Sequence, residues 1–283
     1  MDYVNPEALV STRWLADHLD SPGLCVVDGS WHMPQLKRDA RAEFEAGHIP
    51  GAVYFDIDRI ADRANPLPHM LPDAATFARE VGALGIGNKS QVVAYDSVGV
   101  GSAARVWWMF RTFGHDNVSV LDGGLPKWLA EGRPVQIGPA TPRASTYRAR
   151  LDAALVRDLA QVRGAVANGG EQILDARARG RFAGTEPEPR AGLRGGHMPG
   201  ALNQPYLELY EGEAKTMRQA ADLRALFKDA GLDLSRPVVT SCGSGVTACN
   251  LALALHLIGK SDVAVYDGSW TEWGGRDDTP IET

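Results

Sequence analysis

The sequence contains the same domain twice. Four stretches recur in the same order in the two halves of the chain, and the members of each pair lie about 147 residues apart. The pairs are CVVDGSW with QILDARA, AGHIPGAVYFD with GGHMPGALNQPY, QVVAYDSVGVGSAARVWW with PVVTSCGSGVTACNLAL, and VSVLDGGLPKWLAEG with VAVYDGSWTEWGGR. This period is far too long for a solenoid, so it indicates a tandem duplication.

Each half alternates short apolar runs with helical patterns. Fully apolar strands separated by helices predict an α/β fold in which a parallel sheet is flanked by helices on both faces. We predict an N-terminal domain over 1–140, a linker over 141–151 and a C-terminal domain over 152–283. Residues 133–152 are rich in Pro, Gly, Ser and Arg, which is typical of an extended linker on the surface.

The composition narrows the classes of partner. Apolar residues make up 44% and charged residues 23% of the chain, as in a soluble globular protein. A net charge of -6 argues against binding to nucleic acid or to an anionic membrane. Three cysteines cannot form a disulfide framework, and the N-terminal stretch has no secretory pattern. We therefore expect a cytoplasmic protein.

One of these cysteines lies in a glycine-rich loop, TSCGSGVTACNLAL. Cys242 follows an apolar strand and precedes a helix predicted over about 246–258. A glycine-rich turn that enters a helix points several N–H groups at one centre, where they stabilise an anion such as a thiolate. Gly243 and Gly245 let the backbone curl, and Thr247 is predicted to cap the helix with its hydroxyl. The alternative is a small buried side chain at a strand end.

The first repeat has a carboxylate where the second has this thiol. Asp96 occupies the place of Cys242 and is followed by SVGVGSAARVWW. A carboxylate cannot perform the chemistry of a thiol, so we expect only the second half to be catalytic. The cleft between the two halves is then the natural pocket.

Several motifs together resemble a known family. They are the CGSGVTA loop, the paired GHxPGA stretches (47–52 and 196–201), RFAGTEPEPR (181–190), RVWWMFRTFGH, LDGGLPKWL and YDGSWTEW. In this order they resemble the tandem rhodanese family, and in particular its members that take sulfur from 3-mercaptopyruvate. The resemblance covers essentially the whole chain.

The resemblance implies a role for each site residue. Cys242 matches the cysteine that carries sulfur as a persulfide, and the implied hydroxyl–imidazole–carboxylate relay is Ser244, His69 and Asp58. Arg181 and Arg190 match the substrate-binding arginines, since guanidinium groups fit a carboxylate and a keto oxygen. The remaining substrate-binding residues are expected in the loop: Gly243, Gly245, Val246 and Thr247.

The charge of the loop bears on the sulfur donor. Thiosulfate-using members of the family usually carry basic residues where this chain has Gly243 and Ser244. A neutral loop suits 3-mercaptopyruvate, whose carboxylate is held elsewhere. The implied acceptors are cyanide, small thiols and thioredoxin, and neither a cofactor nor a metal is expected.

Two other functions stay open, namely a thiosulfate sulfurtransferase and a non-enzymatic module that carries sulfur. A phosphatase-like enzyme is disfavoured because Ala248 stands where that chemistry needs an arginine. His48 and His197 recur in both repeats, so we interpret them as structural. Cys249 is expected to be a buried helix residue and Cys25 a core residue. The tryptophans other than Trp14 and Trp31 are expected mainly to pack.

Overall fold

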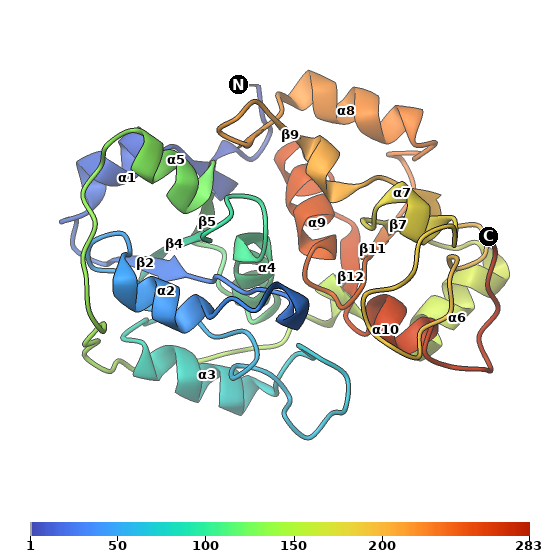
Figure 1. The fold of residues 1–283 in the computed structure, drawn as a ribbon, viewed down its shortest axis with the longest axis horizontal. Coiled ribbons are helices and arrows are strands. Elements are labelled where there is room, and N and C mark those ends of the chain that lie inside the picture. Colours follow the sequence, from blue (N-terminus) through green and yellow to red (C-terminus); the bar gives the residue numbers. More distant parts are fainter. Residues whose placement is uncertain (1) are drawn as a thin grey trace.

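The computed structural model describes residues 2–283 and contains two sheets of the same topology. Each sheet has five strands, in the order β1-β5-β4-β2-β3 in the first domain and β6-β12-β11-β7-β8 in the second (Figure 1). Neighbouring strands in both sheets run parallel. The two orders correspond strand for strand, which confirms the predicted α/β class and the duplication.

The first domain contains these strands and helices: β1 (Leu9–Val10), α1 (Thr12–His18), β2 (Leu24–Asp28), α2 (Ala40–Ala46), β3 (Val53–Tyr54), α3 (Ala74–Ala83), β4 (Gln91–Tyr95), α4 (Ala103–Thr112), β5 (Val118–Leu121) and α5 (Gly124–Ala130). Short 3₁₀ helices precede β1 and α2: η1 (Pro6–Ala8) and η2 (Pro34–Leu36).

The second domain repeats this order: η3 (Ala153–Leu155), β6 (Val156–Arg157), α6 (Leu159–Asn168), β7 (Gln172–Asp175), α7 (Arg179–Phe182), β8 (Leu202–Asn203), η4 (Tyr206–Leu209), β9 (Tyr210–Glu211), β10 (Thr216–Met217), α8 (Ala220–Asp229), β11 (Val238–Ser241), α9 (Ala248–Leu257), β12 (Val263–Tyr266) and α10 (Ser269–Trp273). The small β9–β10 hairpin is an addition to the repeat.

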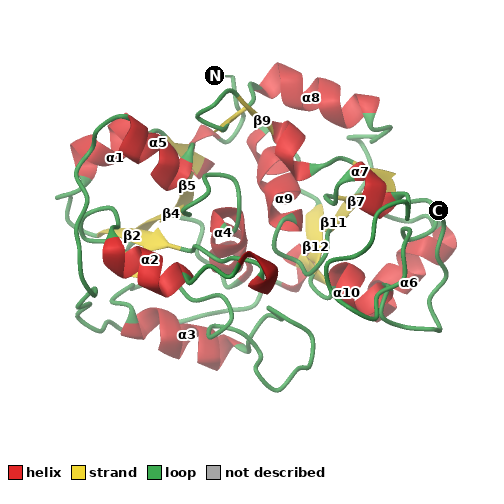
Figure 2. Ribbon diagram, viewed as in Figure 1, coloured by secondary structure: helices red, strands yellow, loops and turns green. Residues whose placement is uncertain are grey.

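Helices cover both faces of each sheet (Figure 2). Successive strand residues point to opposite faces, so Val26 packs in one apolar cluster and Val27 in another. In the first domain, α1, α2 and α5 contribute to the first of these clusters, and α3 and α4 to the second. This two-sided burial explains why the central strands are apolar throughout.

The two domains share one apolar cluster. Helices α4 and α9, which follow equivalent strands, pack against each other between the sheets (Figure 1). Almost every residue of both helices is buried, including the charged Arg105 of α4, so both helices are covered on several sides rather than along one stripe. The cluster that they build contains residues of both sheets. The cleft beside these helices is therefore lined by firmly fixed elements.

The predicted linker is extended chain that packs against the first domain. Ser145 donates its backbone N–H to Gly82 at 2.8 Å, and Tyr147 is buried among aromatic residues of α3 and α4. The exact boundaries 1–140, 141–151 and 152–283 stay a prediction. Within the described residues, none of the helices has the length and apolarity needed to cross a membrane.

Candidate active site

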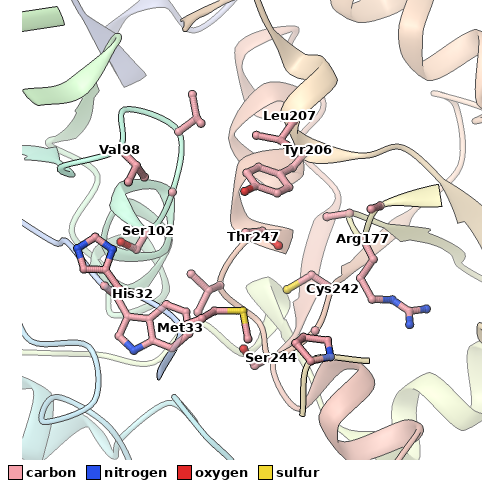
Figure 3. Close-up of a pocket in the computed structure, with 18 of the residues that line it drawn as sticks. His32, Met33, Val98, Ser102, Arg177, Tyr206, Leu207, Cys242, Ser244 and Thr247 are labelled. Carbon is pink, nitrogen blue, oxygen red and sulfur yellow. The ribbon is translucent and has the colours of Figure 1, made fainter. Parts of the chain in front are cut away.

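Cys242 lies in a cleft between the two domains. It follows β11 directly, at the carboxyl end of the second sheet, where open α/β sheets bind their ligands. The cleft has a volume of about 380 Å³. Its walls come from both domains and include Trp31, Met33, Val98, Tyr206 and Ser244. Figure 3 shows Cys242 between labelled residues of the two domains.

The loop after Cys242 turns its carbonyls toward α10. Cys242 O accepts from Trp270 N at 3.0 Å, and Gly243 O accepts from Thr271 N at 2.8 Å. Gly245 has φ +75°, and a Cβ there would lie 2.6 Å from the carbonyl oxygen of Asp267. Only glycine fits this position, as the sequence suggested.

The amides of the same loop are free to bind an anion. Within the described residues, the N–H groups of residues 243–247 donate to no protein acceptor. The equivalent loop of the first repeat is occupied by its own carboxylate. Asp96 accepts from Val98 N, Gly99 N, Gly101 N and Ala103 N at 2.7 to 3.0 Å. In the first repeat, the loop amides therefore bind the Asp96 carboxylate. The second repeat has the sulfur of Cys242 in place of that carboxylate.

Thr247 differs from the prediction. It occupies the N-cap position of α9, which begins at Ala248, but its side chain forms no capping hydrogen bond. Its φ of -78° and ψ of -15° are helical, whereas a capping hydroxyl needs extended backbone to reach the amides behind it. The predicted capping role is therefore wrong. Thr247 and Val246 instead line the cleft.

Two guanidinium groups lie against the cysteine loop. A Cβ on Gly243 would lie 3.1 Å from Arg181 Nη2 and 3.9 Å from Arg190 Nη1. Arg181 is paired with Glu188, to which its Nη2 donates at 2.6 Å. Arg190 forms no ion pair with any described carboxylate, and burial lowers its pKa. A half-buried guanidinium without a carboxylate partner is suited to an anionic ligand.

Glu188 belongs to a buried ion network that orients Arg181. Arg177 is fully buried and donates to both Asp175 and Glu188, at 2.7 and 2.9 Å. Its guanidinium also stacks over Trp270, 4.2 Å from the ring centroid. These contacts hold the Asp175 carboxylate in place at the end of β7, and sequence reasoning missed Arg177.

Two members of the predicted relay meet. His69 Nδ1 lies 2.6 Å from Asp58 Oδ1, and Trp31 Nε1 donates to Asp58 Oδ2 at 2.8 Å. Burial raises the pKa of Asp58, but its bonds to His69 and Trp31 outweigh burial and leave it below its ordinary value. Burial lowers the pKa of His69, although Asp58 opposes this, so the imidazole is neutral near neutral pH.

The third member, Ser244, lies in the cleft wall but forms no hydrogen bond with His69 in the described structure. The Nε2 atom of His69 instead lies 3.5 Å from Arg190 Nη2. His69 itself has φ +61°, a strained backbone for a residue with a side chain. The structure thus shows the contact between His69 and Asp58 but not the contact between Ser244 and His69. The role of Ser244 stays a prediction.

An ion pair across the domain interface connects the backbone of His69 to the cysteine loop. Arg105, in α4, is 0% exposed. Its Nη1 donates to Asp267 Oδ1 at 2.6 Å and to Gly245 O at 3.1 Å, and its Nη2 donates to His69 O. The other Asp267 oxygen accepts from Leu71 N at 2.7 Å. We call Arg105 and Asp267 the interdomain clasp.

The sequence carries a faint sign of the clasp, because Arg105 is the one charged residue in the apolar run 103–110. A related pair of contacts occurs at the equivalent positions of the other domain. Asp122, equivalent to Asp267, accepts from Met217 N at 2.8 Å, and Asn250, equivalent to Arg105, donates to Gly101 O at 3.0 Å. Each domain thus reaches across to the loop of the other.

The remaining sequence candidates are structural. Cys249 is 0% exposed and donates its thiol to Gly245 O at 3.2 Å. Burial raises its pKa. His48 and His197 have matching roles, since Nδ1 of each lies within 2.9 Å of a backbone carbonyl and each ring stacks on a phenylalanine. The five tryptophans considered from the sequence are buried in the core: Trp107, Trp108, Trp128, Trp270 and Trp273. Trp31, which lines the cleft, was not singled out.

Metal binding has no candidate in the described part of the chain, because no three His, Cys, Asp or Glu side chains there are arranged to hold an ion. The arrangement can instead support covalent chemistry at sulfur. The loop that follows the cysteine has amides without protein acceptors, two arginines lie beside this loop, and a carboxylate–imidazole pair lies behind one of them.

Comparison with known proteins agrees with this site. The sequence matches the family described as Rhodanese-like domain over residues 11–131 and 158–276. It is 48% identical to 3-mercaptopyruvate sulfurtransferase of Homo sapiens over 94% of this chain and 91% of the human protein. It is 47% identical to thiosulfate sulfurtransferase of Rattus norvegicus, over 98% of this chain and 94% of the rat protein.

Solved structures give the same result. The crystal structure of SseA from Escherichia coli, described with the fold and mechanism of 3-mercaptopyruvate sulfotransferases, superimposes with a TM-score of 0.85 at 38% identity, covering 93% of this chain and 98% of that one. The Tum1 protein from Saccharomyces cerevisiae gives a TM-score of 0.89 at 32% identity, covering 97% of each chain.

The chain belongs to the rhodanese family, in which it is a member with two tandem rhodanese-like domains. The protein is accordingly a sulfurtransferase, an enzyme that moves sulfur from a small-molecule donor to an acceptor.

Proposed function

We propose that this enzyme takes sulfur from 3-mercaptopyruvate onto Cys242, releases pyruvate, and passes the sulfur to a nucleophilic acceptor. The observation that carries the donor assignment is the position of the arginines. Arg190 pairs with no carboxylate among residues 2–283 and lies with Arg181 against Gly243, so two cationic groups stand beside an uncharged cysteine loop.

A 3-mercapto-2-keto acid fits this arrangement. Its carboxylate binds Arg190, its keto oxygen binds Arg181, and its thiol sulfur lies next to Cys242 Sγ. The Cys242 thiolate attacks that sulfur, and the C–S bond breaks with its electron pair on the departing carbon skeleton. That skeleton is the enolate of pyruvate, which the two guanidinium groups stabilise. The other product is a persulfide on Cys242.

The enolate must then gain a proton. We propose that the Ser244 hydroxyl donates this proton and regains one from solvent by way of His69 Nε2, with Asp58 holding the imidazole in position. The 2.6 Å contact between His69 and Asp58 supports the second half of this path. The first half requires the Ser244 hydroxyl to reach His69 Nε2, which now faces Arg190. Occupation of Arg190 by the substrate carboxylate frees that nitrogen.

Thiosulfate is the competing donor, because relatives named for either substrate are about equally similar to this chain. Thiosulfate is a dianion without a carbon skeleton, so it needs positive charge within the loop itself. Gly243 and Ser244 provide none. We therefore propose that thiosulfate is the poorer donor.

We further propose that cyanide, small thiols and thioredoxin act as acceptors. All three cysteines are free thiols in the structure, which suits a reducing compartment, and on this basis we propose a cytoplasmic location. Fractionation of the source cells tests the location.

The test of the donor uses the enzyme with 3-mercaptopyruvate, with thiosulfate or with neither. We expect pyruvate release and a Cys242 heavier by one sulfur atom with the first donor, and slower loading with the second. The Cys242→Ser variant is expected to fold normally and to release no pyruvate. Loading by thiosulfate alone would refute the donor assignment, and wild-type activity in Cys242→Ser would refute the persulfide mechanism.

A further inference from the structure

A second imidazole lines the cleft, and the proposed mechanism does not use it. His32 lies in the loop after β2, at the carboxyl end of the first sheet. Its side chain is 3% exposed. The ring lies in the first-domain wall of the same cleft that Cys242 lines from the second domain (Figure 3).

One nitrogen of this ring is anchored. Nε2 of His32 lies 2.9 Å from Glu43 Oε2 and 3.4 Å from Ser97 Oγ. Glu43 is fixed in turn, because Arg38 donates to its two carboxylate oxygens from Nε and Nη2, both at 2.7 Å. A carboxylate only accepts hydrogen bonds, so the proton of the neutral imidazole is on Nε2.

The other nitrogen is therefore a free base. With the proton on Nε2, Nδ1 has the lone pair, and no protein group of residues 2–283 donates to it. Within the described structure, Nδ1 is not one of the fully buried polar atoms that lack a hydrogen-bond partner, so this nitrogen remains accessible to solvent. A buried carboxylate–imidazole pair with one open lone pair is the arrangement of a general base.

The surroundings of His32 suit an acceptor rather than the donor. The arginines that suit a keto acid lie in the second domain, whereas the first-domain wall includes the apolar side chains of Trp31, Met33, Val98 and Val100. A cleft of about 380 Å³ is within the range of pockets that enclose drug-sized ligands and exceeds the needs of a three-carbon acid. The extra space next to His32 is apolar, as the body of an organic thiol requires.

Resting on the proposed sulfur transfer, we propose that His32 is the base that deprotonates a small organic thiol acceptor. The acceptor R–SH gives its proton to His32 Nδ1, and the resulting thiolate attacks the outer sulfur of the Cys242 persulfide. The bond between that sulfur and Cys242 Sγ breaks, and its electron pair returns to Sγ as thiolate. The outer sulfur leaves with its hydrogen as R–S–SH. No external oxidant or reductant is needed.

The expected size of the effect follows from thiol ionisation. An ordinary thiol with a pKa of about 8.5 is only about 3% thiolate at pH 7, so a base that supplies the thiolate accelerates transfer by at most about 30-fold. A thiol that is already ionised gains nothing, and sulfite has no thiol proton to lose.

The test is the acceptor half-reaction of His32→Gln. The glutamine amide can still donate to Glu43 but offers no base. Cys242 is loaded with sulfur from inorganic polysulfide, and transfer is followed to 2-mercaptoethanol, to 4-nitrothiophenol, which is ionised at neutral pH, and to sulfite. We expect a loss of at least about 10-fold with 2-mercaptoethanol, which is even less ionised at pH 7 than an ordinary protein thiol, and a change of less than about 2-fold with the other two acceptors. His18→Gln, outside the cleft, is the matched control and should match wild type.

An equal loss with all three acceptors, or no loss with 2-mercaptoethanol, overturns the proposal. Glu43→Gln is the second variant, needed if His32→Gln does not fold, and must show the same dependence on the acceptor. Pyruvate release from 3-mercaptopyruvate is measured separately. Because polysulfide loading bypasses that donor, failure of the donor assignment and failure of the His32 proposal give different results.

Discussion

The interdomain clasp makes a prediction that links stability to catalysis. In Asp267→Asn the side chain keeps its shape but loses its charge, so the fully buried Arg105 guanidinium has no counter-ion. One of the two oxygens also becomes an NH₂ group. It must then face either Arg105 or the N–H of Leu71, both of which are donors.

The magnitude follows from these contacts. Removing one partner of a buried ion pair costs about 3–5 kcal/mol, because the other charge stays buried and unpaired. For a chain of this size each kcal/mol corresponds to about 2–4 °C, so we expect Tm to fall by about 6–20 °C. Arg105 also holds His69 O and Gly245 O, and displacement of reacting groups by about 1 Å costs up to about 100-fold in rate. We therefore expect kcat to fall by at least about 10-fold.

The assay combines scanning calorimetry with steady-state pyruvate release, and the repeat provides the matched control. Asp122→Asn changes the equivalent residue, which accepts from Met217 N across the interface, and an amide oxygen can still accept from that group. We expect a small change in Tm and an unchanged kcat for Asp122→Asn. If Asp267→Asn lowers Tm and kcat no more than Asp122→Asn does, the clasp has no special role.

Three further predictions concern the site and its surroundings. Arg190→Ala removes the unpaired guanidinium and should raise the KM for 3-mercaptopyruvate by about 10-fold or more, since charge-assisted hydrogen bonds contribute about 1.5–3 kcal/mol; an unchanged KM in initial-rate kinetics would exclude Arg190 from the site. Replacing Gly243 by Arg together with Ser244 by Lys should shift the ratio of the two donor activities toward thiosulfate, and a constant ratio would contradict the loop-charge argument. Burial and Arg111 lower the pKa of His256 from 6.5 to about 4, so unfolding takes up a proton between these pH values, and stability is lost as pH falls through this window. Tm should therefore fall less between pH 7 and 4.5 in His256→Asn than in wild type; equal losses would show that His256 does not contribute.

The repeat in the sequence was enough to predict the architecture. Equivalent apolar runs in the two halves became strands with the same order in two parallel sheets. The placement of Cys242 followed as well, because a residue after a parallel strand must lie at the carboxyl edge of the sheet. Periodicity and strand direction are local properties, and local properties can be read from one chain.

Contacts that depend on docking of the domains could not be predicted in this way. Arg105 and Asp267 are 162 positions apart, and nothing in the spacing of either residue indicates the other. The capping role expected of Thr247 failed because the backbone is already helical there. Residue type alone does not report that torsion. The local signal at Arg105 was a charge within an apolar helix, which predicts burial with a partner but does not identify it.

The apolar cluster shared by the two sheets determines whether either domain can fold without the other. A half expressed alone would expose to water the face of α4 or α9 that now packs against the other domain, and most side chains of both helices are apolar. We therefore expect the fold of each copy to depend on the other, and the copy without the thiol to stabilise the copy that has it. Heating or denaturant should therefore melt the whole protein in one step, and the ancestral single domain can be recovered only by making this face polar or by letting it pair with itself.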